Sequence, residues 1–164
     1  MNYLNSISYA GVTGWRLPVV TPVNGSSFND NYSSDGSTDV GYNTTAINPT
    51  ASELAHVYSN ELGNLYFYDT SGMPAQSDAG VTNPGPFHNL GDSWYWSGRE
   101  GPEYLHMAWS FTTNGGGQHY FLKHYRFRGW AVRPGQVAAV PVPAAVWLFG
   151  SALAGLGVIA RRRG

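Results

Sequence analysis

Few residues of this sequence have the types and spacing that catalysis or metal binding requires. The chain has no cysteine, which excludes disulfides, thiolate catalysis and thiolate metal sites. Gly91-Asp92-Ser93 has the letters of an esterase nucleophile motif, but that motif belongs after an N-terminal strand and not in mid-chain. The histidines form no HExxH motif or other close ligand spacing, and we expect packed or surface side chains at His56, His88, His106, His119 and His124. We therefore predict a non-enzymatic protein with no cofactor and no metal site.

The loop at 24–49, rich in Asn, Ser, Asp, Gly and Thr, is the one candidate for a cation. Oxygen-bearing side chains alternate around Gly36 as they do in a calcium loop, at Asn31, Ser33, Asp35, Ser37 and Asp39. The twelfth position of such a loop is Tyr42 here, where a bidentate glutamate is needed. We expect these side chains to form local turns in a solvated loop, with cation binding as the alternative.

Aromatic and basic residues in the second half of the chain are candidates for sugar binding. Tyr95, Tyr104 and Tyr120 have rings that could stack on sugars if exposed, and packing in or around the core is the alternative. Arg126 and Arg128 are candidates for contact with an acidic polysaccharide, with a solvated strand face as the alternative.

The elements that must position these residues change from helical to strand periodicity along the chain. Thr50 and Glu53 form a capping box ahead of an apolar helix face, and Gly63 can end the helix, which predicts a helix over Ala51–Leu62. Residues 2–9 have helical spacing and Leu65–Tyr68 could be a short strand. Residues then alternate with period two over 94–97, 107–112 and 125–133, with a hairpin turn at 114–117. This order predicts an α+β fold with a Trp-rich antiparallel sheet that has one buried face.

The last 25 residues, 140–164, combine an apolar segment with a basic end. Residues 144–160 carry no charge, and at about 1.5 Å per residue they reach roughly 26 Å, the short end of a bilayer span. We predict a transmembrane helix here, with a buried core helix as the alternative. The residues predicted to lie in the membrane include Ala144, Trp147, Leu148, Phe149, Leu153, Leu156, Ile159 and Ala160. The basic cluster predicts a cytoplasmic C-terminus: Arg161, Arg162 and Arg163.

Length and charge fit one domain followed by this tail. We predict a body at 1–135, a linker at 136–140 and a tail at 141–164, in a chain of 164 residues with a formal net charge of −1. Nothing in this charge distribution indicates a nucleic-acid partner. The first residues, MNYLNSISYAGVTGWRLP, lack the basic start and apolar run of a signal peptide, so we expect the sequence to be a fragment. An unusual tail-anchored cytoplasmic protein is the alternative.

The tail, VPVPAAVWLFGSALAGLGVIARRRG, resembles a PEP-CTERM protein-sorting signal. The sorting motif maps to Val140, Pro141, Val142 and Pro143, with Val142 in place of the family's usual glutamate. The resemblance implies export, transient anchoring in the inner membrane with the body in the periplasm, and processing by an exosortase, a membrane cysteine protease. The chain would be the substrate of that enzyme, destined for the cell surface or extracellular matrix.

The body resembles a domain of unknown function like the C-terminal domain of Lcl adhesins. The resemblance is carried by GWRLP at 14–18, YWS at 95–97 and WAVRPG at 130–135. It implies a C-type-lectin-like body that lacks its first strand, with Trp15, Trp96 and Trp130 in the core. The calcium motifs of C-type lectins and the cysteines of sulfatase-modifying enzymes are absent. We expect a non-enzymatic surface or matrix protein; the alternatives are a polysaccharide-binding module and an anchored enzyme.

Overall fold

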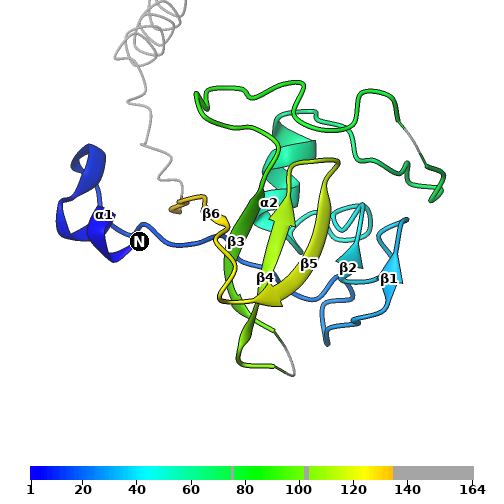
Figure 1. Ribbon diagram of the computed structural model, residues 1–164, viewed down its shortest axis with the longest axis horizontal. Helices are drawn as coiled ribbons and strands as arrows, with labels where there is room; N and C mark the ends of the chain where they lie inside the picture. The colour runs from blue at the N-terminus through cyan, green and yellow to red at the C-terminus, as the bar shows by residue number, and fades with distance from the viewer. Residues whose placement is uncertain (75, 102–103, 135–164) are drawn as a thin grey trace, which may run out of the picture. The chain divides into compact units, whose positions relative to one another are not determined.

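The centre of the fold is an antiparallel sheet of three strands, Trp94–Glu100 (β3), Met107–Thr112 (β4) and Gly117–Leu122 (β5) (Figure 1). The computed structural model describes residues 1–74, 76–101 and 104–134. Strands β4 and β5 pair without interruption from Met107 opposite Leu122 to Thr112 opposite Gly117. The predicted hairpin is confirmed, and its glycines supply the positive φ angles that the turn requires, +80° at Gly115 and +79° at Gly116.

Short strands extend this sheet on both sides and make it mixed. Tyr32–Ser33 (β1), Val40–Gly41 (β2) and Arg128–Gly129 (β6) complete the order β1-β2-β5-β4-β3-β6. The pairs β1–β2 and β3–β6 are parallel, so the prediction of a wholly antiparallel sheet is wrong. Residues 125–133 contribute only β6 and a bridge from Val132 to Arg16.

The helix predicted over 51–62 is present but has another form. An α-helical turn, Glu53–Ala55 (α2), continues as a π-helical turn, His56–Glu61 (η2), in which the Leu62 N–H donates to the Val57 carbonyl at 3.0 Å. Ser52, and not Thr50, is the N-cap, since its Oγ accepts from the Ala55 N–H at 3.3 Å. Gly63 ends the helix with φ +70°, as expected.

Glu53 has a different role from the predicted capping box. Its carboxylate binds the Arg16 guanidinium through two hydrogen bonds of 2.6 and 2.7 Å. It also accepts from the Val19 N–H at 2.7 Å. The Arg16 hydrogen bond, more than the backbone bond, holds the pKa of Glu53 below its usual value against the effect of burial. The pair therefore ties the N-terminal segment to the helix.

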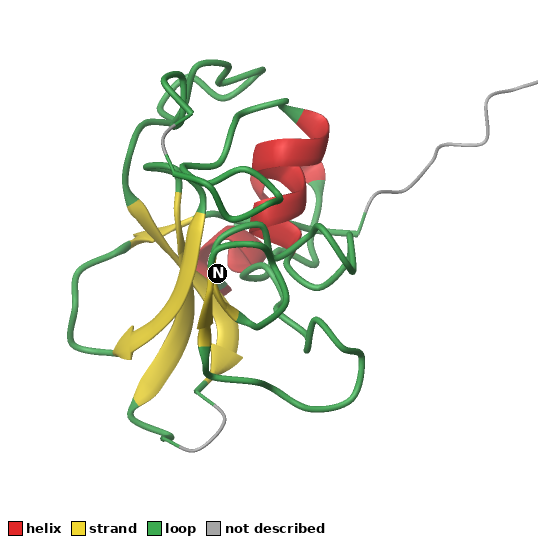
Figure 2. Ribbon diagram, turned by 90° about the vertical axis from the view of Figure 1, so that its right-hand side faces the viewer, coloured by secondary structure: helices red, strands yellow, loops and turns green. Residues whose placement is uncertain are grey.

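Figure 2 shows the helix on one side of the sheet. Leu54, Ala55 and Tyr58 pack there against Tyr95 and Phe111 of the sheet. A second cluster gathers Val20, Val40 and Trp109. Of the three tryptophans expected in the core, only Trp130 is buried, whereas Trp15 and Trp96 are partly exposed.

Of two other predicted elements, the helix near the N-terminus is present and the short strand at Leu65–Tyr68 is not. Residues 2–9 contain a helix at Asn2–Ser6 (α1) with no buried residue. Leu65–Tyr68 forms isolated bridges, Leu65 to Ala79 and Tyr68 to Pro74, instead of a strand. The chain there follows a long loop whose backbone is held by side chains, so no continuous ladder forms.

Residues Met1–Arg133 form one compact unit with an α+β structure, close to the predicted end of the body at 135. The predicted sorting motif at 140–143, the transmembrane helix at 144–160 and the arginines at 161–163 lie outside the described residues. Within the described part of the chain, no helix has the length and apolar character needed to cross a bilayer.

Candidate functional site

The sheet face opposite the helix carries a cluster of large aromatic rings. Phe127 lies between the two tryptophans of β3, with its ring centre 5.7 Å from that of Trp94 and 4.7 Å from that of Trp96. Phe121 is 4.8 Å from Trp94, and Tyr125 stacks on Phe127 at 5.5 Å. We call this set, Trp94, Trp96, Phe121, Tyr125 and Phe127, the aromatic face. Tyr125 is 47% exposed and the other four are partly exposed.

Strand periodicity explains why these rings gather. Side chains two apart on a strand share a face, so Trp94 and Trp96 point away from the core to which Tyr95 belongs. The middle strand places only small side chains under them: Ser110 pairs with Trp96, and Ala108 pairs with Phe121. Large rings on β3 and β5 therefore lie over β4, and Ser110 of β4 is buried beneath them.

Basic residues lie around the aromatic face, and Arg128 among them pairs in register with Tyr95 and so belongs to the side of the sheet opposite Trp94 and Trp96. Arg126 and Arg128 flank Phe127 in the chain, are exposed, and have no ion pair with any residue in the described ranges. His119 lies 5.1 Å from Phe121, and His124 stacks on Tyr125 at 4.8 Å. Basic side chains without acidic partners make this region attractive to anions.

A groove of about 340 Å³ adjoins the aromatic face at Trp96. It follows the irregular part of β3, where the register shifts between Trp96 and Glu100. Lys123 lines it and forms an ion pair with Glu100.

The structure separates the three tyrosines predicted as sugar contacts. Tyr95 is only 5% exposed, and its hydroxyl donates to the Gly91 carbonyl at 3.2 Å, so the prediction that it faces a ligand is wrong. Tyr120 is half-buried with its ring 5.2 Å from that of Trp109. Tyr104 is exposed and contacts His106. Of the predicted residues, Arg126 and Arg128 are exposed and flank Phe127 in the chain, next to rings that sequence analysis did not select.

The loop at 24–49 uses its polar side chains to hold its own backbone. Asp39 is almost fully buried, and its two carboxylate oxygens accept the Val23 and Asn29 N–H groups, each at 2.7 Å. Asp35 accepts the Ser37 N–H at 3.0 Å. Among the described residues, no three His, Asp or Glu side chains come together as metal ligands would. The polar pattern in this loop therefore has a structural explanation.

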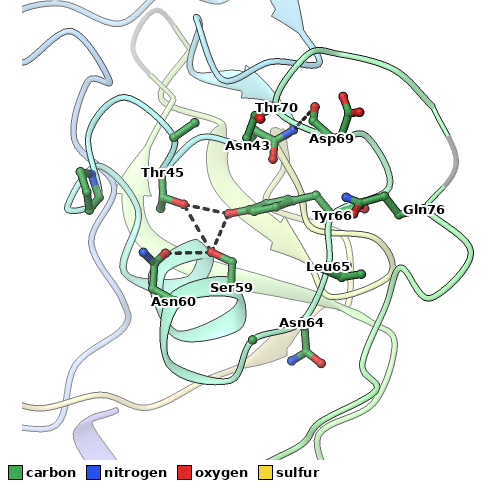
Figure 3. Close-up of a pocket in the computed structure, with 13 residues that line it drawn as sticks. Asn43, Thr45, Ser59, Asn60, Asn64, Leu65, Tyr66, Asp69, Thr70 and Gln76 are labelled. Carbon is green, nitrogen blue, oxygen red and sulfur yellow. Dashed lines mark hydrogen bonds between the residues drawn. The ribbon is translucent and has the colours of Figure 1, made fainter.

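A separate hollow of about 570 Å³ lies beside the π-helical turn (Figure 3). We call it the polar pocket, and its principal side chains are Asn43, Thr45, Ser59, Asn60, Tyr66 and Gln76. The Tyr66 hydroxyl lies 3.0 Å from Thr45 Oγ1 and 3.1 Å from Ser59 Oγ. Burial raises the pKa of Tyr66, so its hydroxyl is neutral at physiological pH.

Comparison with models of protein families, with curated proteins and with solved structures found no significant match. The two resemblances of this chain rest on short motifs, at 14–18, 95–97 and 130–135 in the body and at 140–163 in the tail. Similarity therefore assigns no family to the chain, and the chemistry of its surface is the basis for a function.

Proposed function

We propose that this chain is a non-enzymatic, exported protein of the cell surface or extracellular matrix, whose body binds acidic polysaccharide. One observation carries the proposal: the partly exposed rings of the aromatic face and two exposed arginines, which have no ion pair among the described residues, meet at the β6 edge of the sheet. The fold proposed for the body is C-type-lectin-like, which is supported by the helix packed on a mixed sheet of short strands.

Polysaccharide fits the aromatic face because a sugar ring has an apolar C–H face and a polar rim. Large rigid rings bury the apolar face at low entropic cost, and neighbouring polar groups bind the hydroxyls. Trp96 and Phe127 offer such rings, with centres 4.7 Å apart and planes inclined by 37°. The groove beside Trp96 supplies room for further sugar units.

The arginines favour an acidic ligand over a neutral one. A guanidinium matches carboxylate and sulfate groups with two parallel hydrogen bonds. Since Arg126 and Arg128 have no acidic partner among the described residues, binding an anion breaks no existing ion pair of theirs. Charge contacts of this kind weaken as ionic strength rises.

The tail supports the proposed location through its sequence pattern. A proline-bracketed motif, 17 uncharged residues and three terminal arginines stand in the order of a sorting signal. The proposed tail crosses the inner membrane with its arginines on the cytoplasmic side, and an exosortase-type protease removes it. Co-expression of a secreted form of the chain with such a protease should shorten the product at its C-terminus, and unchanged mass would contradict this part.

Binding is tested with the full chain in detergent micelles and two immobilised polymers, acidic polygalacturonate and neutral dextran. We expect retention on polygalacturonate that falls with added salt. Replacing Tyr125 with alanine removes an exposed ring of the aromatic face and should weaken binding about 2- to 13-fold, since one aromatic contact contributes about 0.5–1.5 kcal/mol. The matched control is Tyr3→Ala, which removes a tyrosine that is 72% exposed and outside this face.

The charge contribution is tested with the double variant Arg126→Gln/Arg128→Gln. It should lose most of the salt dependence and the preference for the acidic polymer. Equal retention on the two polymers by the unmodified chain, or equal losses in Tyr125→Ala and Tyr3→Ala, would overturn the proposal.

A further inference from the structure

The polar pocket has no residue in common with the aromatic face, and its lining chemistry is different. The loop at 43–49, the π-helical turn, the segment 63–70 and Gln76 surround it (Figure 3). Asp69 is its one acidic lining residue, and Asp69 Oδ1 accepts the Ser71 and Met73 N–H groups at 2.9 and 3.0 Å. Figure 3 shows this carboxylate directed away from the hydroxyls of Tyr66 and Ser59. The interior of the pocket is therefore polar and uncharged.

Asn43 places an unused acceptor at this pocket. Its Nδ2 donates to the carbonyls of Ser34, Tyr68 and Asp69 at 2.7, 3.0 and 3.0 Å, which fixes the orientation of the amide. The residue is 3% exposed, and its Oδ1 accepts no hydrogen bond from any described residue. This oxygen is not among the fully buried side-chain acceptors without a partner, which in the described residues are Thr44 Oγ1 and Gln118 Oε1, so it is open to water and to a ligand that donates here.

The hydroxyls of Tyr66, Thr45 and Ser59 have fewer protons to donate than there are acceptors around them. Ser59 Oγ lies 2.8 Å from the Ala55 carbonyl and 2.9 Å from Asn60 Oδ1, and its single proton can serve only one of these acceptors. The other contacts of Ser59 are to the hydroxyls of Tyr66 and Thr45, whose protons can point in either direction along the network. Hydroxyl groups of a ligand can supply the missing donors and accept in return.

The π-helical turn is a second indication of a site. Such turns are rare, and they frequently mark functional positions because they cost stability relative to a regular α-helix. This turn presents Ser59 and Asn60 to the polar pocket, while Tyr58 stays in the core. Pro49 and Leu65 add apolar surface to the same lining.

We infer that the polar pocket binds a small uncharged polyol of about the size of a monosaccharide. The hydroxyls of the ligand donate to Asn43 Oδ1 and Asn60 Oδ1, and its C–H groups lie against Pro49 and Leu65. A volume of about 570 Å³ is in the ordinary range of small-molecule sites. An anion finds no cationic side chain in this lining, and an ammonium group finds no inward-facing carboxylate.

The test is ligand-observed saturation-transfer NMR on the full chain in detergent micelles. The probes are glucose and myo-inositol as neutral polyols, glucuronate as an anion and glucosamine as a cation. We expect transfer to a neutral polyol, and a dissociation constant raised roughly 3- to 10-fold in Asn60→Ala, which removes one side-chain contact. Thr70→Trp, which places an indole at the edge of the pocket, should abolish transfer, whereas Ser71→Trp, at the next exposed position outside the lining, should leave it unchanged.

Two further results decide the inference. Tyr125→Ala, on the aromatic face, should leave polyol binding intact, so that failure of this site and failure of the polysaccharide proposal are separate outcomes. Absence of transfer to both neutral probes, a preference for glucuronate or glucosamine, or equal transfer in Thr70→Trp and Ser71→Trp would overturn the inference. If Thr70→Trp fails to fold, an unchanged dissociation constant in Asn60→Ala overturns the inference instead.

Discussion

Removing the hydroxyl of Tyr58 should destabilise the body and change its stability at high pH. This side chain is fully buried, and its Oη can donate to the Leu65 carbonyl at 2.6 Å or the Gly80 carbonyl at 3.2 Å while it accepts the Gly80 N–H at 3.0 Å. Tyr58→Phe keeps the ring and removes these hydrogen bonds, which leaves the Gly80 N–H with only its longer bond of 3.3 Å to the Leu65 carbonyl. The free energy of unfolding at pH 7 should fall by about 2–3 kcal/mol, the net value of two hydrogen bonds with buried partners.

The pH dependence of the same variant is a stricter test. Burial raises the pKa of Tyr58 from 10.0 to about 12. Because the folded state favours the neutral phenol, the stabilisation is complete below pH 10 and is lost as pH rises from 10 to about 12, where the unfolded chain releases the proton first. This difference corresponds to about 2.7 kcal/mol, so the stability gap between the unmodified chain and Tyr58→Phe should close over that interval.

Urea unfolding of the full chain in micelles, followed by tryptophan fluorescence between pH 7 and 12, measures both effects. Tyr104→Phe is the matched control, since it removes an exposed hydroxyl and should change the free energy of unfolding by less than about 0.5 kcal/mol. Equal stability of Tyr58→Phe and the unmodified chain at pH 7, or a gap that stays constant to pH 12, would refute this reasoning.

Two further substitutions test the turns and the N-terminal ion pair. Gly116→Ala should lower the free energy of unfolding by about 2–4 kcal/mol, because its Cβ would overlap the Tyr66 ring and φ is +79°. The control is Gly63→Ala, which has φ +70° but open space around it and should lower the free energy of unfolding by about 1 kcal/mol. Equal losses of the two variants in urea unfolding would contradict the steric argument. The hydrogen bond from Arg16 lowers the pKa of Glu53, so this pair stabilises the body above the ordinary pKa of a glutamate, and the stabilisation is lost as pH falls through the lowered folded-state value. Glu53→Gln should remove that acid dependence, by less than about 1 kcal/mol because the pair is more than one-third exposed; acid unfolding curves that superimpose would exclude this role.

Local features of the body were predictable from sequence, and the arrangement of distant segments was not. The glycines at 115–117 and the apolar residues of the 51–62 segment carry strong local signals, and the hairpin and the helix lie where expected. The parallel pairs β1–β2 and β3–β6 join segments whose few residues have no distinctive pattern. Two-residue strands gain their stability from the neighbours they meet, which sequence periodicity does not specify.

In the candidate site, sequence periodicity groups the side chains of β3 by face but does not say which face is buried. Period two correctly separates Tyr95 from Trp94 and Trp96, but it does not indicate which set faces the core. The resemblance implied that Trp96 is in the core, and Tyr95 was a candidate for ligand contact, whereas the structure buries Tyr95 and leaves Trp96 partly exposed. The helix decides the matter, because Tyr58 and Leu54 pack on the face that carries Tyr95.

The bridge between Arg16 and Val132 has a consequence for how the chain matures. Two backbone hydrogen bonds of 2.8 and 2.9 Å join positions at opposite ends of the body. Contacts between such distant residues close a long loop, so they slow folding and cannot form until synthesis has passed Val132. During translation, the segment around Arg16 therefore lacks these two hydrogen bonds, and it pairs with the segment around Val132 only after the ribosome has synthesised both.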